Sequence, residues 1–414
     1  MPLKILHTAD WHLGQVFHEY DRSFEHETFL KWLIKTVCEY DIDVLLMSGD
    51  VFDVSNPSAA STRLYYWLLR ELTAAQPNIQ IIITAGNHDS AARLEAPKLL
   101  LEAFNISIVG LVQKNTDATA NYENLIIPLK NKAGQRKAWC MAIPYLKQGD
   151  YPVIEGATQP YAQGITKFYQ DAYACVVNKK LPGEAIVAMG HLHTLDATSS
   201  EEDKSERAIM GGIEFIPASA FHEQIAYTAL GHIHKAQKVA KKENIRYSGS
   251  PIPMSFSEIN YKHQVIYIEL EGEIAGKIEP IEIPLSIELL RVPAKPEPLN
   301  KVLIELNQLP EVTDKTYAPF LEIRILLDGP EPSLRHKIES AIENKQVRLT
   351  RIIAIYKDPS PDENNGIKRQ NDLTQLKPFD ILSKVYEKKY NNKIPDELVK
   401  LYIEVSQKIE SSEK

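Results

Sequence analysis

Four short polar motifs in this chain contain side chains suited to metal-dependent chemistry. Each motif follows an apolar run, and the four are Asp10-Trp11-His12, Gly49-Asp50, Gly86-Asn87-His88-Asp89 and Gly231-His232-Ile233-His234. A fifth element, Gly190-His191, follows another apolar run and adds one imidazole. This collection of Asp, Asn and His suits two metal ions that share one carboxylate, with a histidine left for acid-base work.

The ligand types narrow the choice of metal. Aspartate is a hard anionic oxygen donor that can bridge two cations, imidazole is a borderline nitrogen donor, and a side-chain amide adds a neutral oxygen. Such a mixed set fits Mn²⁺, Fe or Zn²⁺ better than Mg²⁺. Cys38, Cys140 and Cys175 lie outside the motifs and form no closely spaced pair, which argues against a structural zinc site and suggests a reducing compartment.

Each motif has a simpler explanation when it is taken alone. Asp10-Trp11-His12, for example, is also typical of a helix cap with a surface histidine nearby. The preceding segments favour a common site, because all five are aliphatic or β-branched runs of strand length: 3–7, 42–47, 79–84, 185–189 and 225–230. Layered α/β folds place their sites at the carboxyl ends of successive strands, so we expect these five elements to meet.

The other histidines singled out lie outside the motifs. We expect each of them to be a surface or packing residue: His7, His18, His26, His222 and His263. Residues 22–40 and 58–75 carry apolar side chains at helical spacing, which completes an α/β pattern. The aromatic run 64–69 is mostly core in this interpretation, and one edge of it, with the segment 97–104, is an alternative subunit contact.

The pattern changes after about residue 284. Strands are predicted at 287–292, 320–326 and 349–356, and helices at 299–306 and 333–342, which together make a small α+β unit over residues 285–357. Residues 358–375 are rich in Pro, Asn and charge and predict a linker. The charged segment from Glu201 to Arg207 predicts a surface loop.

Residues 376–414 predict a pair of helices, each opened by a proline, at 378–390 and 395–409. The second helix has an apolar stripe formed by Leu398, Leu401, Tyr402, Val405 and Ile409. Two short helices cannot bury much surface by themselves, so we expect them to dock on a partner. Folding back onto the same chain is the alternative.

Composition indicates a large protein of more than one domain, with 414 residues of which 44% are hydrophobic. A net charge of −8 is opposite to the usual footprint of a DNA-binding domain. Two bound divalent ions would reduce the negative charge at the site, and a partner protein can supply the basic surface that DNA binding needs. The chain starts a strand at its third residue, without a basic segment and a long apolar run, so we expect a cytoplasmic protein with no membrane span.

The motifs together resemble those of the calcineurin-like metallophosphoesterases. Longer strings, namely 7–14, 49–53 and 247–251, resemble the SbcD family in particular, the nuclease subunits of bacterial SbcCD complexes. The resemblance is strong over residues 1–285 and extends to the remainder by organisation only. It implies an α/β fold in which a β-sandwich flanked by helices (residues 1–284) is followed by an α+β capping domain and a C-terminal helix pair.

The resemblance also implies roles for the site residues. One ion would be held by Asp10, His12, Asp50 and His234, and the other by Asp50, Asn87, His191 and His232. Asp50 would then bridge the two ions, for which Mn²⁺ is the expected metal. His88 would serve acid-base chemistry or stabilise the transition state, and Asp89 would orient it.

The implied activity is that of a DNA nuclease regulated by ATP, with 3′ to 5′ exonuclease action on duplex ends and endonuclease action on single strands and hairpins, in DNA repair and recombination. The partner would be an SbcC-like ATPase whose coiled coil is gripped by the helix pair, in a heterotetramer built on a homodimer of this chain. This chain lacks the Gly-x-x-x-x-Gly-Lys-Ser/Thr phosphate loop, so the partner would hydrolyse ATP. The alternative is a stand-alone metallophosphatase or cyclic-nucleotide phosphodiesterase, which would need neither a cap nor a helix pair.

Overall fold

The computed structural model describes residues 2–195, 215–311, 314–329 and 331–356, together with Tyr386, Pro395, Leu398 and Val399. The chain divides into two compact units, Met1–Ile355 and Tyr356–Lys414. The predicted linker at 358–375 and the loop Glu201 to Arg207 lie outside the described residues, as does almost all of the helix pair at 376–414. The predicted boundary at 284–285 falls inside the first unit and stays a prediction.

Two six-stranded sheets form the larger part of the first unit. In spatial order the first sheet contains β14 (Ile274–Glu282), β13 (Gln264–Glu271), β1 (Leu3–Thr8), β4 (Val44–Ser48), β5 (Gln80–Thr84) and β6 (Ile106–Val109). The second contains β11 (Gln237–Lys238), β12 (Ile245–Tyr247), β10 (Tyr227–Gly231), β9 (Ala185–His191), β8 (Arg136–Ala142) and β7 (Ile126–Lys130). In each sheet four neighbouring strands are parallel: β1, β4, β5 and β6 in the first, and β12, β10, β9 and β8 in the second. Antiparallel pairing adds β13 and then β14 beside β1 in the first sheet, and β11 and β7 at the two edges of the second.

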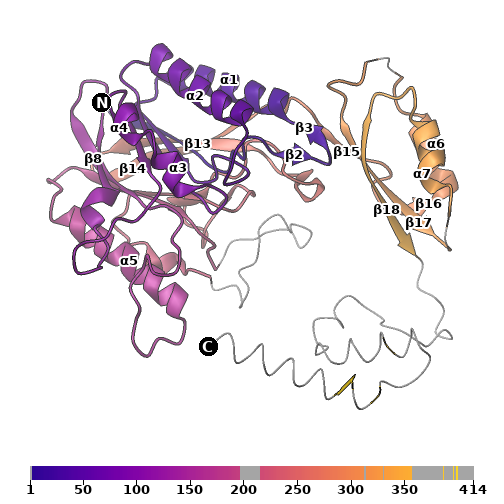
Figure 1. The fold of residues 1–414 in the computed structure, drawn as a ribbon. Coiled ribbons are helices and arrows are strands. Elements are labelled where there is room, and N and C mark those ends of the chain that lie inside the picture. Colours follow the sequence, from indigo (N-terminus) through magenta and orange to yellow (C-terminus); the bar gives the residue numbers. More distant parts are fainter. Residues whose placement is uncertain are drawn as a thin grey trace. The chain divides into compact units, whose positions relative to one another are not determined.

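Alternate residues of the first sheet enter two different cores. Ile5 and Leu46 pack in the core that contains the second sheet, whereas Leu6 and Met47 pack beneath the helices α1 (Ser23–Glu39) and α2 (Ala59–Ala75). Successive side chains of a strand point to opposite faces, so these aliphatic runs are buried on both sides. Figure 1 shows α1 and α2 together on one side of the layered domain.

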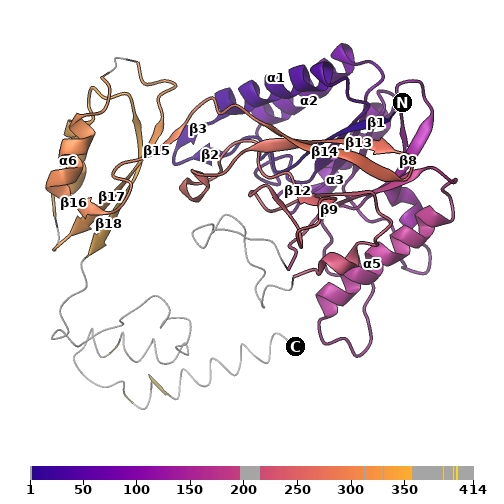
Figure 2. The same cartoon turned by 180° about the vertical axis from the view of Figure 1, so that it is seen from behind.

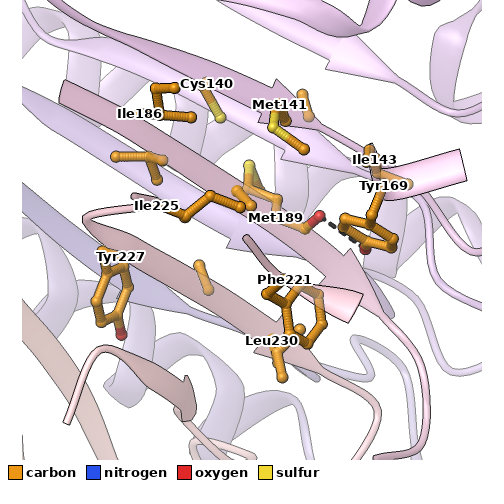
Figure 3. Packing of buried hydrophobic residues seen from close by; sticks show 14 of the residues in the cluster. Cys140, Met141, Ile143, Tyr169, Ile186, Met189, Phe221, Ile225, Tyr227 and Leu230 are labelled. Carbon is orange, nitrogen blue, oxygen red and sulfur yellow. Dashed lines mark hydrogen bonds between the residues drawn. The ribbon is translucent and has the colours of Figure 1, made fainter. Parts of the chain in front are cut away.

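The helix α5 (Pro160–Val177) packs on the second sheet. Its Tyr169 donates a hydrogen bond of 3.1 Å from the side-chain oxygen to the carbonyl of Met189 on β9, among the apolar side chains of Met141 and Phe221 (Figure 3). This contact fixes the end of β9 just before His191. Shorter helical elements are α3 (Ala91–Glu95), α4 (Lys98–Glu102), η1 (Tyr122–Leu125), η2 (Ala218–Ala220) and η3 (Phe256–Glu258).

The capping domain predicted at residues 285–357 is described as far as residue 356, and residues 285–356, called the cap below, have their own apolar core. It contains β15 (Leu289–Arg291), β16 (Glu297–Pro298), α6 (Leu299–Asn307), β17 (Phe320–Leu327), α7 (Leu334–Ala341) and β18 (Arg348–Tyr356), with β17 paired to the three other strands. Figure 2 shows α6 lying beside these strands. A small hairpin of β2 (Val16–Phe17) and β3 (Tyr20–Asp21) belongs to the N-terminal part.

The predicted strands and helices are confirmed within about two residues of their expected ends wherever the structure describes them. The expected sandwich flanked by helices is therefore correct. Among the described residues, no helix combines the length and the apolar character needed to cross a membrane.

A buried ion pair lies where the cap meets the β2–β3 hairpin. Arg22 is fully buried and donates from Nε to Glu25 Oε2 (2.9 Å), while its Nη1 donates to the carbonyl of Pro253. Its guanidinium carbon lies 5.0 Å from the ring centre of Phe17 and 5.9 Å from that of Phe320 in the cap. A charge in such a place is stable only while its partner remains.

We therefore predict that Glu25→Ala lowers the free energy of unfolding by about 3–5 kcal/mol, because it leaves the Arg22 charge buried and unpaired. Glu27→Ala is the matched control on the same helix, since Glu27 pairs with Lys31 at the surface and such pairs contribute about 0–1 kcal/mol. Urea unfolding followed by circular dichroism measures both. Equal losses in the two variants would contradict the importance of burial.

Candidate metal centre

The five predicted elements meet at one place in the structure. Asp10 and His12 follow β1, Asp50 follows β4, and the motif 86–89 follows β5, and these three strands are parallel neighbours. His191 ends β9, and His232 and His234 follow its parallel neighbour β10. Because β4 contacts both β9 and β10 across the sandwich, the carboxyl ends of both sheets supply the site.

Four of the predicted site residues have a backbone conformation that non-glycine residues seldom adopt. The φ angles are 54° at Asp10, 46° at His12, 53° at Asp50 and 97° at His232. Each such residue costs about 1–3 kcal/mol, and such conformations cluster at functional sites. The tight turns point the side chains back across the ends of their strands.

Two motif glycines allow the loops to approach one another. A Cβ atom on Gly86 would lie 2.1 Å from Asp50 Oδ1, and one on Gly231 would lie 1.9 Å from the carbonyl oxygen of Ser48. Any side chain at either position would separate the motifs. The glycines in the sequence motifs are therefore explained by close backbone contact.

The first group of converging ligand atoms belongs to Asp10, His12 and His234, which lie within 4.8 Å of one another. The Nε2 atoms of His12 and His234 are 3.2 Å apart. Two nitrogens bound to one ion at about 2.1 Å would lie roughly 3.0–3.4 Å apart, so this spacing fits a shared cation. His234 Nδ1 pairs with Glu258 Oε1 at 3.1 Å, which leaves its Nε2 lone pair for the centre.

The second group gathers around Asn87. Its Oδ1 lies 2.8 Å from His191 Nε2 and 3.0 Å from His232 Nδ1, and His191 Nε2 lies 3.2 Å from Asp50 Oδ2. The other nitrogen of His191 bonds to the carbonyl of Ser48 at 3.0 Å, which fixes the ring. Carboxylate, amide oxygen and two imidazoles thus face one point.

Asp50 lies between the two groups. Its Oδ2 is 3.7 Å from His12 Nε2 and 3.2 Å from His191 Nε2, while its Oδ1 accepts a hydrogen bond of 2.8 Å from the backbone of His88. Asp50 Oδ2 and Asp10 Oδ2 are both buried, and neither accepts a hydrogen bond within the described part of the chain. Buried carboxylate oxygens without donors are what a cation would satisfy, so the residues fit the predicted ions.

The ionisation of the centre follows from burial and neighbouring charge. Burial raises the pKa of Asp10. It acts in the same direction on Asp50, but the neighbouring histidines, His191 above all, together outweigh it and the pKa of Asp50 is lowered. Burial alone would lower the pKa of His191, whereas the Asp50 carboxylate raises it to about 10. A proton and a cation therefore compete for the same nitrogen.

His88 lies beside the first group. Its Nδ1 bonds to the backbone carbonyl of Asp53 at 2.8 Å, and its half-buried ring stands edge-on to His12 with ring centres 4.8 Å apart. One of its nitrogens lies within 4.8 Å of ligand atoms of His12 and Asp50. The structure thus brings His88 to the centre, where its ring is only half buried.

The expectation that Asp89 orients His88 is wrong. The Asp89 carboxylate accepts three backbone hydrogen bonds, from Val51 (3.1 Å), Phe52 (3.0 Å) and Gly86 (2.9 Å), and the carbonyl of Asp53 orients His88 instead. Burial raises the pKa of Asp89 to about 6. Asp89 ties the loop after β4 to the loop after β5, because the buried backbone N–H groups there need an acceptor.

Two acidic residues at the centre were not predicted. Asp53 Oδ1 lies 3.3 Å from His12 Nδ1, and Glu258 holds His234 as described above. Burial alone would lower the pKa of His12, but the carboxylates of Asp53, Asp50 and Asp10 together outweigh burial and raise it. Carboxylates that bind the outer nitrogen of a ligating histidine fix its orientation. Asp53 lies in the string 49–53 and was open to detection, whereas Glu258 lies in no motif.

The histidines outside the motifs are packing or surface residues, as predicted. His7 bonds to the Tyr227 side-chain oxygen at 2.9 Å and His26 to the carbonyl of Trp11 at 3.1 Å, and burial lowers the pKa of both to about 3. His263 is buried, while His18 and His222 are exposed.

Two protein families match this chain. Residues 3–236 match the family described as calcineurin-like phosphoesterase. Residues 287–390 match the family described as type 5 capsule protein repressor C-terminal domain.

Two relatives are named as the SbcD component of nuclease SbcCD. One, from Rhodobacter capsulatus, is 34% identical over 84% of this chain and 86% of its own length. The other, from Escherichia coli K12, is 32% identical over 84% of each chain. Among solved structures, a dimetal phosphatase from Danio rerio is 12% identical with a TM-score of 0.38, covering 69% of this chain and all of its own.

Asp50 is the residue on which both predicted ions depend. We predict that Asp50→Asn abolishes the stabilisation that Mn²⁺ gives the wild-type chain, which would be about 2.7 kcal/mol at a metal concentration 100 times Kd. Thermal unfolding with and without Mn²⁺ measures it, and Asp171→Asn, which changes a surface partner of Lys167, is the control. An undiminished Mn²⁺ effect in Asp50→Asn would exclude the bridging role.

Proposed function

The chain belongs to the SbcD family of nuclease subunits, within the calcineurin-like phosphoesterases, and we propose that its metal centre hydrolyses phosphodiester bonds of DNA. The observation that carries this proposal is the position of Asp50. One buried oxygen of its carboxylate lies 3.7 Å from His12 Nε2 and 3.2 Å from His191 Nε2, one histidine of each ligand group, and makes no well-directed hydrogen bond within the described residues. That arrangement suits two cations sharing one ligand, which is the arrangement used for in-line displacement at phosphorus.

The proposed ligands are those of the two groups described above. Asp10, His12, Asp50 and His234 would hold one ion, and Asp50, Asn87, His191 and His232 the other, with Mn²⁺ as the proposed metal. When bound, two divalent ions lower the pKa of water and neutralise charge on a phosphodiester. The mixed nitrogen and oxygen donors support Mn²⁺ over Mg²⁺.

Other groups of the protein orient the proposed ligands and supply a proton to the leaving group. The Ser48 carbonyl and Glu258 hold the rings of His191 and His234, so each presents its Nε2 to the centre. His88, fixed through Nδ1 by the Asp53 carbonyl, presents its other nitrogen and would protonate the departing sugar oxygen. Asp89 acts indirectly, by holding the two loops that carry Asp50 and His88.

We propose that the chain works beside an SbcC-type ATPase, on DNA ends and hairpins. The relatives' name places each of them in an SbcCD nuclease. The sequence of the C-terminal segment, a polar linker followed by an amphipathic stripe, supports docking of that segment on the ATPase. The net charge of −8 also supports a partner that supplies basic surface.

We further propose a homodimer within the heterotetramer. Three apolar side chains on and next to α4 are highly exposed: Leu99 (86%), Leu100 (68%) and Phe104 (54%). Contiguous exposed apolar surface is typical of association sites.

The proposed cytoplasmic location is supported by Cys38, Cys140 and Cys175, which are free thiols.

The role of His88 generates a prediction about turnover. His88→Asn should leave metal binding intact, because His88 is outside both ligand sets, and should slow Mn²⁺-dependent DNA cleavage by about 10²–10⁴-fold. Metal analysis of the purified variant and single-turnover cleavage of a labelled hairpin measure the two effects. His336→Asn, an exposed histidine of the cap, is the control.

The same assay tests the proposed function. We expect the wild-type chain to cleave DNA when divalent metal is present and not to cleave it when the metal is removed. Hydrolysis of phosphomonoesters or cyclic nucleotides without any DNA cleavage would favour the stand-alone phosphatase instead. Loss of a bound ion in His88→Asn would make His88 a ligand.

The C-terminal segment generates a second prediction. Truncation before Leu376 should preserve Mn²⁺-dependent cleavage of a short single strand, since every proposed ligand precedes it, and should abolish association with the SbcC-type ATPase. Leu401→Glu with Val405→Glu is the finer version, because it places charge on the predicted apolar stripe. Co-purification measures association, and full recovery of the ATPase with the truncated chain would assign the segment to this chain's own packing.

A further inference from the structure

The turn η3 contacts both the cap and the metal centre. Its first residue, Phe256, contacts the cap, and its last residue, Glu258, contacts the proposed ligand His234. We propose that η3 transmits the position of the cap to His234, so that the cap sets the affinity for the ion held by Asp10, His12 and His234. The inference rests on the metal centre of the proposed function.

At the metal end, Glu258 is fully buried and both of its oxygens are engaged. Oε1 lies 3.1 Å from His234 Nδ1, and Oε2 accepts a hydrogen bond of 2.9 Å from the backbone of Met254. The backbone N–H of Ser250 also donates to the carbonyl of His234 at 3.1 Å. The segment 250–258 therefore contacts both the ring and the carbonyl of His234, so a displacement of η3 would turn or withdraw its imidazole.

At the cap end, Phe256 is 1% exposed and packs in one apolar cluster with Ile287 and Phe320 of the cap. Its carbonyl accepts a hydrogen bond of 3.0 Å from Arg291 Nη2. Arg291 is held in turn by Glu322 on β17, whose carboxylate is fully buried. The cap thus contacts η3 through packing and through one directed hydrogen bond.

The N-terminal part of the chain holds the start of the same segment. Arg22 donates to the carbonyl of Pro253, and Gln15 Nε2 donates to the carbonyl of Met254 at 3.3 Å. Because closely packed interiors have few voids, a shift imposed at Phe256 cannot be absorbed before Glu258, two residues later. The cap contact is therefore a positioning contact for His234.

The expected loss of metal affinity differs between substitutions at the metal end of η3 and at its cap end. Loss of a carboxylate that holds a ligating histidine usually costs 10–100-fold in metal affinity, so we expect about that loss in Glu258→Gln. Arg291 acts one step further away, and couplings between separate sites of about 0.5–2 kcal/mol correspond to roughly 2–30-fold. Arg291→Ala should fall in this range, although it touches no proposed ligand.

The experiment titrates the full chain with Mn²⁺ by isothermal titration calorimetry. In Glu258→Gln and Arg291→Ala we expect one of the two ions to bind more weakly and the other to bind as in the wild type. Arg291→Lys keeps a cationic donor and should recover part of the affinity. Arg335→Ala is the matched control, because this cap arginine pairs with Glu339 on the exposed face of α7, and it should bind both ions normally.

A second readout separates positioning from general loss of structure. Arg291→Ala should raise the Mn²⁺ concentration needed for half-maximal DNA cleavage and leave kcat at saturating Mn²⁺ close to the wild-type value. A damaged fold would lower kcat at every metal concentration, and that result would overturn the inference.

The outcomes also distinguish this inference from the proposed function. If the wild-type chain binds two Mn²⁺ ions and Arg291→Ala binds both with unchanged affinity, the coupling is overturned and the metal centre stands. If the wild-type chain binds no Mn²⁺, the metal centre itself fails, and the coupling fails with it.

Discussion

The concentration of buried charge at the carboxyl ends of the two sheets is the constraint on which the structure depends. Asp10 and Asp50 are fully buried, and a carboxylate in such a place is costly unless donors or cations surround it. Backbone N–H groups of His88 and His232 satisfy one oxygen of each. The remaining oxygens make no hydrogen bond within the described residues, so a pair of cations is the arrangement that would complete their coordination.

The fold holds these buried charges in place through strained backbone conformations and close contacts between loops. The residues with positive φ angles have an unfavourable backbone conformation, and the motif glycines leave no space for a side chain. Both features allow loops from the two sheets to come within hydrogen-bonding distance of each other. Parallel strands buried on both faces form a rigid base, which can hold such loops in place. Asp89 serves the same purpose, because its three backbone hydrogen bonds join two of the loops that carry site residues.

Much of this arrangement could be predicted from the sequence, because strand runs and the motifs that follow them are local patterns. Asp10, Asp50 and Asn87 are recognisable by residue type and by position after a strand. The orientation of each side chain depends on residues that are distant in sequence, and the prediction for Asp89 was wrong for that reason. Although Asp89 and His88 are adjacent in sequence, they bond to different residues of the loop after β4. Glu258 was missed because its partner His234 is 24 residues away and no spacing rule connects them.

The net charge of the chain says less about its partners than the distribution of charge does. Around the buried carboxylate of Glu322 in the cap, three guanidinium groups gather, from Arg291, Arg324 and Arg351. Such a local cluster of cationic side chains occurs in a chain whose overall net charge is −8. Because Arg291 also holds the carbonyl of Phe256, this arginine cluster is joined by one residue to η3, the turn that carries Glu258 to His234.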